Sequence, residues 1–137
     1  MAGKTFLDTN ILVYAVDQDA ATRRDASRKV IESVVADGSG VISTQVMQEF
    51  YVAATRKLGM PPLAAKTVLN TFAVFEIVQI SPDLIQDAID CSVLKTLSFW
   101  DALIVAAAAS AGCARVFTED LNPGQSVLGV AIENPLG

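Results

Sequence analysis

The stretch TFLDTNILVYAV, residues 5–16, decides how the chain is interpreted. A short apolar run of strand-like composition ends in Asp8, and residues 11–16 follow with helical character. In parallel α/β folds, ligand sites lie beyond the carboxyl ends of the strands. Asp8 therefore stands where chemistry is expected, provided that the rest of the chain repeats this order of strand and helix.

Strand-like and helical segments do alternate along the remaining sequence. Further strands are predicted at residues 40–43, 75–80 and 114–118, with a fifth within 127–133. Helices are predicted at residues 23–37, 45–58, 62–72, 83–97 and 99–111, with Thr44 capping the second and Ser98 the last. Helices between short apolar strands imply parallel strands covered on both faces. We therefore predict an α/β fold, a three-layer α/β/α sandwich with a short, mainly parallel central sheet of four to five strands.

The composition is that of one folded domain. The chain has 137 residues, of which 52% are apolar and 18% charged, whereas an average soluble domain has about 25% charged residues. This excludes intrinsic disorder and suggests that a partner or a second copy covers some apolar surface. The charge-free run at residues 102–114 is shorter than the roughly 20 residues of a membrane span, and Asp8 interrupts any signal-peptide core. We expect residues 1–137 to form a single cytoplasmic domain.

The residue types that are missing exclude several classes of enzyme. The chain contains no histidine and only two cysteines, Cys91 and Cys113, without a CxxC pattern. Serine–histidine triads, cysteine–histidine pairs and histidine zinc sites are therefore excluded. Both cysteines are expected as small buried side chains. The net charge of −5 does not attract phosphate backbones, so contact with nucleic acid requires a local basic patch or bound cations.

Four acidic residues have bulky apolar neighbours, and three of the four fall at or just after predicted strand ends or at helix starts: Asp8, Glu49, Asp101 and Asp120. Each alone has an ordinary explanation as a helix cap, a solvated acid or a turn residue. If they converge, one pair at roughly 4 Å repels by about 4 kcal/mol, so the cluster requires raised pKa values or bound cations. Oxygen ligands without histidine or cysteine suit Mg²⁺ or Mn²⁺, and such ions promote phosphodiester hydrolysis.

Four motifs in this order resemble those of PIN-domain proteins. The first and third, FLDTNILVYA at residues 6–15 and FWDALIVAAA at residues 99–108, are the specific ones. The second and fourth, QEFY at residues 48–51 and FTEDL at residues 117–121, are weak when taken alone. Their order and spacing, and the length of the chain, resemble the VapC-type toxin ribonucleases of bacterial toxin–antitoxin pairs.

The resemblance implies a PIN-like fold and an endoribonuclease that depends on Mg²⁺ or Mn²⁺. It also implies a homodimer and a small antitoxin protein that blocks the site. Carried over by position, the metal ligands would be Asp8 and Asp101, completed by Glu49 and Asp120. Asn10 and Thr118 would hydrogen-bond these carboxylates or the waters around the metal. Between Glu119 and Asp120, alternation from Thr118 favours Asp120.

RNA requires positive charge near these acids, and two basic pairs are candidates: Arg23 with Arg24, and Arg56 with Lys57. Arg56 follows Glu49 by seven residues, which is two α-helical turns, so both are predicted on one helix face. A solvated helix face is the ordinary alternative for all four basic residues.

Two apolar features have an open interpretation. Trp100 could stack on a base, but we expect it in the core. The second feature is equally consistent with the core and with a dimer or antitoxin surface, and it comprises Leu63, Leu69, Phe72, Val74 and Phe75.

Other families with acids at strand ends fit less well. A haloacid-dehalogenase-like phosphatase requires a second aspartate where this chain has Asn10. A receiver domain requires a lysine at a strand end, whereas Lys95 lies within a predicted helix. Two alternatives remain open: a catalytically silent PIN-like scaffold that binds a partner protein, and a PIN nuclease of RNA processing. The presence of all four acids argues against the silent scaffold.

Overall fold

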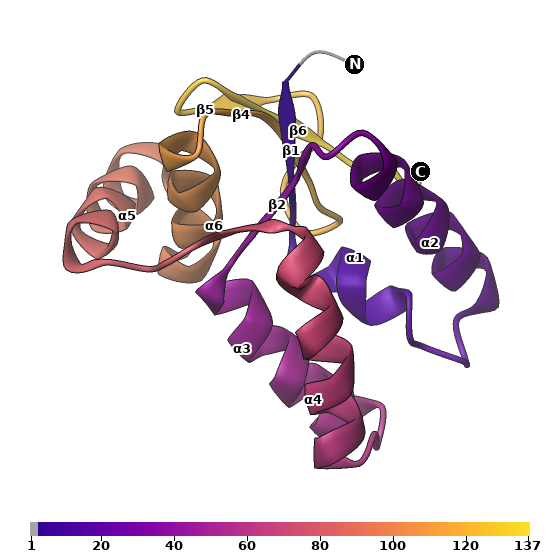
Figure 1. Cartoon of the computed structure of the whole chain (residues 1–137). Helices are drawn as coiled ribbons and strands as arrows, with labels where there is room; N and C mark the ends of the chain where they lie inside the picture. Colours follow the sequence, from indigo (N-terminus) through magenta and orange to yellow (C-terminus); the bar gives the residue numbers. More distant parts are fainter. Residues whose placement is uncertain (1–2) are drawn as a thin grey trace.

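Among residues 3–137, which this computed structural model describes, six strands form one sheet with helices on both faces. The strands are β1 (Lys4–Leu7), β2 (Gly40–Ser43), β3 (Glu76–Val78), β4 (Cys113–Phe117), β5 (Ser126–Val127) and β6 (Val130–Glu133). The helices are α1 (Thr9–Tyr14), α2 (Ala21–Ala36), α3 (Thr44–Val52), α4 (Pro62–Thr71), α5 (Pro82–Lys95) and α6 (Phe99–Ser110). A π-helical turn, η1 (Ala53–Lys57), and a 3₁₀ turn, η2 (Phe72–Val74), complete the elements. Figure 1 shows α5 and α6 on one side of the sheet and α1, α2 and α4 on the other.

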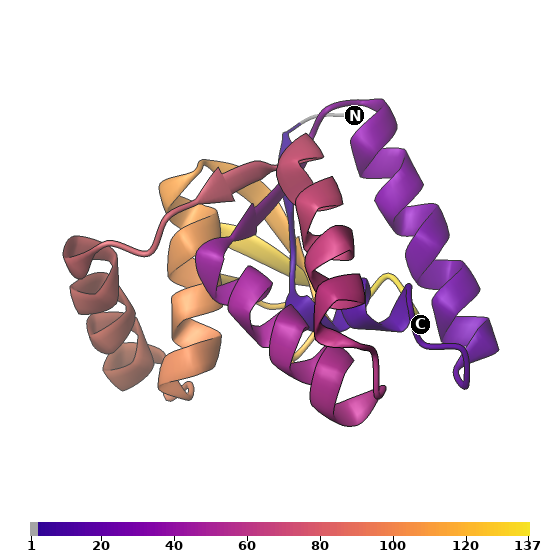
Figure 2. The ribbon, with the colours of Figure 1, turned by 60° about the horizontal axis from the view of Figure 1, so that its bottom comes forward.

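The sheet is parallel except at one edge. Its strand order is β3-β2-β1-β4-β6-β5, and only the β5–β6 pair is antiparallel. In register, Phe6 of β1 lies opposite Val41 of β2 and Val116 of β4. The carboxyl ends of these three strands therefore share one edge. Figure 2 shows β1 running into α1 at this edge, with α3 beside it. The predicted three-layer fold is confirmed.

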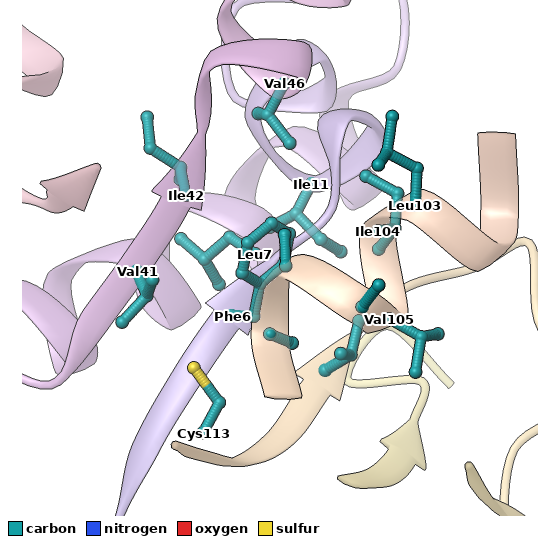
Figure 3. Packing of buried hydrophobic residues seen from close by; sticks show 14 of the residues in the cluster. Phe6, Leu7, Ile11, Val41, Ile42, Val46, Leu103, Ile104, Val105 and Cys113 are labelled. Atoms are coloured by element: carbon teal, nitrogen blue, oxygen red, sulfur yellow. The ribbon is translucent and has the colours of Figure 1, made fainter. Parts of the chain in front are cut away.

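The core lies between β1, its neighbouring strands and α6. Helix α6 is apolar around its whole circumference, and residues 102–108 are all buried, as expected for a helix enclosed by α5 and the sheet. Each fully buried aliphatic side chain contributes about 1.5–3 kcal/mol, so β1 is firmly held up to Leu7. Figure 3 shows part of this packing, which includes Phe6, Leu7, Val41, Ile42, Val46 and Ile104.

The carboxyl-terminal segment differs from the prediction. The strand predicted within residues 127–133 is present as β6, but it pairs with a further short strand, β5, in a hairpin, so the described sheet has six strands instead of four to five. Leu128 and Gly129, which connect the two strands, have φ values of 52° and 78°. Positive φ at both central residues is typical of a tight hairpin turn. Leucine is rare in that conformation, which is why the turn escaped prediction.

Most predicted helices are present, with shifted ends. Helix α1 begins at Thr9 because the Asp8 side chain accepts a hydrogen bond from the Thr9 backbone N–H. Helix α3 is capped by Ser43 and not by Thr44, since the Ser43 hydroxyl accepts from the Val46 N–H. The predicted Ser98 cap of α6 is confirmed.

The predicted apolar stretch at residues 63–75 divides between core and surface. Phe72 and Phe75 are buried, whereas Leu63 and Val74 are exposed. Cys91 and Cys113 are free and buried, as predicted. Within residues 3–137 no single helix is both long and apolar enough to cross a membrane. Helices α5 and α6 meet those criteria only when taken together, and they are bent by 117°.

Candidate active site

Asp8 lies at the centre of the carboxyl edge, directly after β1. Its side chain is only 4% exposed. One carboxylate oxygen, Oδ1, accepts from the Thr9 N–H at 2.7 Å, and the other accepts from the Thr118 hydroxyl at 2.8 Å. The strand and the helix cap thus hold this carboxylate in one orientation, beneath the surface of the site.

The charge on Asp8 is poorly compensated. Its pKa is raised from 3.8 to about 6, chiefly by burial and also by the nearby Asp120 and Glu49 carboxylates. The hydrogen bonds from Thr118 and Thr9 act in the opposite direction but do not cancel the effect of burial. Among residues 3–137, no lysine or arginine forms an ion pair with Asp8. Within the described part of the chain, the Asp8 carboxylate therefore has no ion-pair partner of its own.

Glu49 comes from α3 and is oriented by two polar neighbours. The Thr9 hydroxyl donates to Glu49 Oε1 at 2.7 Å, and Gln45 Nε2 donates to Glu49 Oε2 at 3.3 Å. The same Gln45 nitrogen donates to the backbone carbonyl of Trp100 at 3.2 Å. Since Gln45 is 3% exposed, this link joins α3 to the first turn of α6 inside the protein.

Thr118, at the end of β4, connects three parts of the site. Its buried hydroxyl donates to Asp8 and accepts from the Asp120 N–H at 3.0 Å and from Asn10 Nδ2 at 3.5 Å. The other amide atom, Asn10 Oδ1, is buried without a hydrogen-bond partner. An unsatisfied buried acceptor points to an absent donor, such as a ligand or water. These contacts bring together five of the residues singled out in the sequence, namely Asp8, Asn10, Thr118, Glu49 and Asp120.

Asp101 occupies the first turn of α6 and is half-buried. Its backbone N–H donates to the Ser98 hydroxyl at 3.1 Å. Its neighbour Trp100 lines the cleft. Of the four predicted acids, Glu49 and Asp120 line the cleft, whereas Asp8 and Asp101 do not.

Glu119 is held apart from the cluster by its own partners. The Tyr14 hydroxyl donates to Glu119 at 2.6 Å, and Arg23 Nε donates at 2.9 Å. The Arg23 guanidinium also lies over the Tyr14 ring, 5.6 Å from its centroid. The Tyr14 hydrogen bond holds the pKa of Glu119 below its usual value, and Arg23 lowers it further. Of the basic residues predicted for RNA, Arg23 pairs with Glu119, and Arg24 pairs with Asp25.

A cleft of about 730 Å³ is lined by two groups of residues, which include Thr9 and Asn10, the two residues after Asp8. The α1 wall, from α1, the turn after it and the loop after β4, contains Thr9, Asn10, Tyr14, Asp17, Glu119 and Asp120. The α3 wall, from α3, η1 and the first turn of α6, contains Gln45, Gln48, Glu49, Val52, Lys57 and Trp100. Three carboxylates thus lie on the α1 wall, whereas the α3 wall carries one, Glu49, together with apolar surface and a lysine.

The π-helical turn η1 decides which basic residue reaches the cleft. Its backbone bond from the Leu58 N–H to the Ala53 carbonyl spans five residues, one more than in an α-helix. Because of this extra residue, the side chain that lies two helical turns beyond Glu49 is that of the eighth residue, Lys57, and not that of the seventh, Arg56. Lys57 lines the cleft and Arg56 does not. The predicted alignment of Arg56 with Glu49 is wrong for this reason.

The donor chemistry fits a hard divalent cation. Within residues 3–137, no three carboxylate or cysteine side chains close on one point as a complete metal site. Mg²⁺, however, is commonly held by one or two carboxylates together with several waters. Asp8 supplies uncompensated charge, and the unpartnered Asn10 oxygen supplies a further acceptor. These residues suit Mg²⁺ or Mn²⁺ better than any softer metal.

Sequence reasoning missed three residues that shape the site: Thr9, Gln45 and Tyr14. Each lies within a few residues of a predicted acid and carries a hydrogen-bonding group among apolar neighbours. Their roles depend on partners 40 or more residues away, such as Glu49 for Thr9 and Glu119 for Tyr14. That local polar signal was present in the sequence, but the partners were not identifiable from it.

Comparisons with known proteins were made on sequence and on structure. The sequence model of the PIN domain family matches residues 5–124. No match was found among the curated proteins. A toxin–antitoxin complex from Klebsiella pneumoniae is 21% identical with a TM-score of 0.71, covering 96% of this chain and 98% of that one. VapBC2 from Rickettsia felis, bound to a promoter DNA fragment, is 18% identical with a TM-score of 0.70, covering 95% and 97%. Mycobacterium tuberculosis VapC20, a sarcin–ricin loop cleaving toxin, is 20% identical with a TM-score of 0.64, covering 85% and 92%.

Proposed function

The chain belongs to the PIN domain family, and we propose that it is a divalent-metal-dependent endoribonuclease, the toxin of a toxin–antitoxin pair. The observation that carries this proposal is the buried Asp8 carboxylate, which has two further carboxylates nearby and no cation from the described chain. Keeping such a charge buried costs stability. A site of this kind suits a cation that arrives with water and an RNA phosphate.

Some residues of the site would hold the metal ion, and others would orient the residues that hold it. Asp8 and Asp101 would hold Mg²⁺ or Mn²⁺, completed by Glu49 and Asp120. When bound, the metal lowers the pKa of water and offsets the negative charge that develops on the phosphate. Thr118 holds Asp8 in orientation through its hydroxyl, and Thr9 and Gln45 do the same for Glu49. These contacts prepare the acids before substrate arrives.

The role as a toxin is supported by the relatives of similar fold. Two of them are described as a toxin–antitoxin complex and as VapBC2, and the third as a toxin that cleaves the sarcin–ricin loop. The described surface also carries apolar side chains suited to a partner, namely Leu63, Val93 and Leu94, each at least 75% exposed. We propose that a second copy and an antitoxin protein cover such surface.

Cleavage of a mixed RNA pool tests this function. The purified protein is incubated with Mg²⁺, with Mn²⁺ or with EDTA, next to an Asp8→Asn variant of nearly the same shape. We expect cutting that requires metal and falls on the order of 100-fold or more in the variant, since the charge that holds the cation is lost. Sequencing the cut ends then defines the target.

The matched control is Asp83→Asn, which removes an exposed carboxylate at the start of α5, far along the chain from the site. It should cut like the unmodified protein. Metal-independent cutting, equal cutting by Asp8→Asn, or no cutting by a folded protein in any condition would each contradict the proposed function. In the last case, the partner-binding scaffold would become the better description.

A further inference from the structure

Trp100 has an unusual position for the chain's single tryptophan. It was expected in the core, but its side chain is 61% exposed and lines the cleft. The residues that follow it in α6 are buried, so the exposure is confined to the first turn of the helix. A large exposed aromatic ring beside a cluster of acids marks a contact surface.

The ring is held in place by its surroundings. Its edge meets Phe99 in a T-shaped arrangement with 5.1 Å between centroids and 75° between planes. The backbone carbonyl of Trp100 accepts from Gln45 Nε2, which also donates to Glu49. A single side chain therefore separates the Trp100 backbone from an acid of the site. Such a preformed aromatic surface loses little conformational freedom when a flat ligand stacks on it.

The two walls of the cleft indicate what kind of ligand fits. The α1 wall presents the carboxylates of Asp17, Glu119 and Asp120 and therefore disfavours a bare phosphate. The α3 wall combines Trp100 and Val52 with Lys57, a cation suited to a phosphate next to a stacked base. Aromatic surface together with positive charge is the usual arrangement for single-stranded nucleic acid.

We propose that Trp100 is the stacking surface of a nucleobase subsite, with Lys57 contacting the adjoining phosphate. The inference rests on the proposed nuclease function and deepens it, because a base can stack here only when it is unpaired. The substrate is then a single-stranded or looped RNA, and not a continuous duplex.

Two measurements on the complete chain test the subsite. The first uses Trp100 fluorescence in the Asp8→Asn variant, so that binding is observed without cutting. A short oligoadenylate RNA should quench the emission, whereas an abasic oligomer of equal length and charge, or a matched RNA duplex, should not. The second compares cleavage kinetics of the RNA pool's preferred substrate by the unmodified protein and by variants at Trp100.

Trp100→Ala should raise KM by about 5- to 150-fold, the range measured for losing one base stack, with kcat nearly unchanged. Trp100→Phe should recover part of the loss. Tyr51→Ala is the matched control, because Tyr51 is an exposed aromatic residue on α3 that does not line the cleft; its kinetics should be unchanged.

Several results would overturn the subsite. They are an unchanged KM in Trp100→Ala, equal quenching by the abasic oligomer, and emission that shifts with protein concentration but not with RNA. The last would mean that a protein surface covers Trp100. In each case metal-dependent cleavage by the unmodified protein would still support the nuclease, so failure of the subsite and failure of the function are distinguishable.

Discussion

Two carboxylates stand just after neighbouring parallel strands, and the fold surrounds them in opposite ways. Asp8, after β1, is almost completely buried, receives only neutral hydrogen-bond donors, and has a pKa raised to about 6. Glu119, two residues after β4, is held by Tyr14 and by the Arg23 ion pair, and its pKa is lowered. Both positions are acidic, but Glu119 lines the cleft, whereas Asp8 is buried and only the residues after it, Thr9 and Asn10, line the cleft.

The two environments give the two carboxylates different roles: Asp8 belongs to the candidate site, whereas Glu119 makes a structural contact. Glu119 has its compensating charge within the protein, so it ties the loop after β4 to α1 and α2 and requires nothing further. Asp8 has no such partner among the described residues, and its charge destabilises the fold unless a cation binds. Strongly perturbed groups of this kind cluster at functional sites. The comparison can be tested at both carboxylates.

The largest effect concerns the pH dependence of stability without metal. Folded Asp8 keeps its proton up to about pH 6, whereas the unfolded side chain releases it near 3.8. Between these values the folded state binds more protons, so stability falls as pH rises, by about 3 kcal/mol in total. Urea unfolding in EDTA at several pH values should show this decline in the free energy of unfolding of the unmodified protein but not of Asp8→Asn. If the free energy of unfolding changed with pH in the same way in both proteins, Asp8 would not be destabilising.

The next effect is stabilisation by metal. With free Mg²⁺ at about 100 times its dissociation constant, binding to the folded state alone adds about 2.7 kcal/mol. Thermal unfolding with increasing Mg²⁺ should therefore raise the Tm of the unmodified protein. The rise should persist in Glu119→Gln, where only the structural contact changes, and vanish in Asp8→Asn. Loss of the rise in Glu119→Gln alone would reverse the assignment of the two acids.

The smallest effect concerns the contacts of Glu119. Tyr14→Phe removes the hydroxyl that donates to Glu119, and Arg23→Gln removes the ion pair of a half-exposed arginine. Exposed ion pairs contribute about 0.2–1 kcal/mol, so Arg23→Gln should lose only that much stability in urea unfolding. Tyr14→Phe should lose about 1.5 kcal/mol, because its hydroxyl donates to a charged group. A much larger loss, or one that disappears when Mg²⁺ is added, would place Glu119 within the metal site.

Local pattern accounts for much of what could be predicted. Short apolar runs between amphipathic segments indicated parallel strands, and the Ser98 cap and the apolar run after Asp101 located α6. The acids at strand ends were identifiable because in a parallel sheet all carboxyl ends share one edge. These features depend on residues close together in the chain, and periodicity and capping report them directly.

Contacts between distant segments account for what was missed. Because of the π-helical turn η1, Lys57 lines the cleft and Arg56 does not. The local composition gives no sign of this turn. The exposure of Trp100 depends on which distant segments pack against the first turn of α6. The tight turn at Leu128 requires positive φ that leucine seldom adopts, and it is stabilised by the pairing of β5 with β6.

The amino-acid sequence by itself determined the order of strands and helices, the apolar core and the positions of the acids. Hydrophobic periodicity and helix capping involve residues close together in the chain, so they can be identified from the sequence without a structure. Only the tertiary structure decided that Asp8 has no ion-pair partner among residues 3–137 while Glu119 has Arg23. A pKa depends on burial and on charges brought together from far along the chain, and those distances exist only after folding.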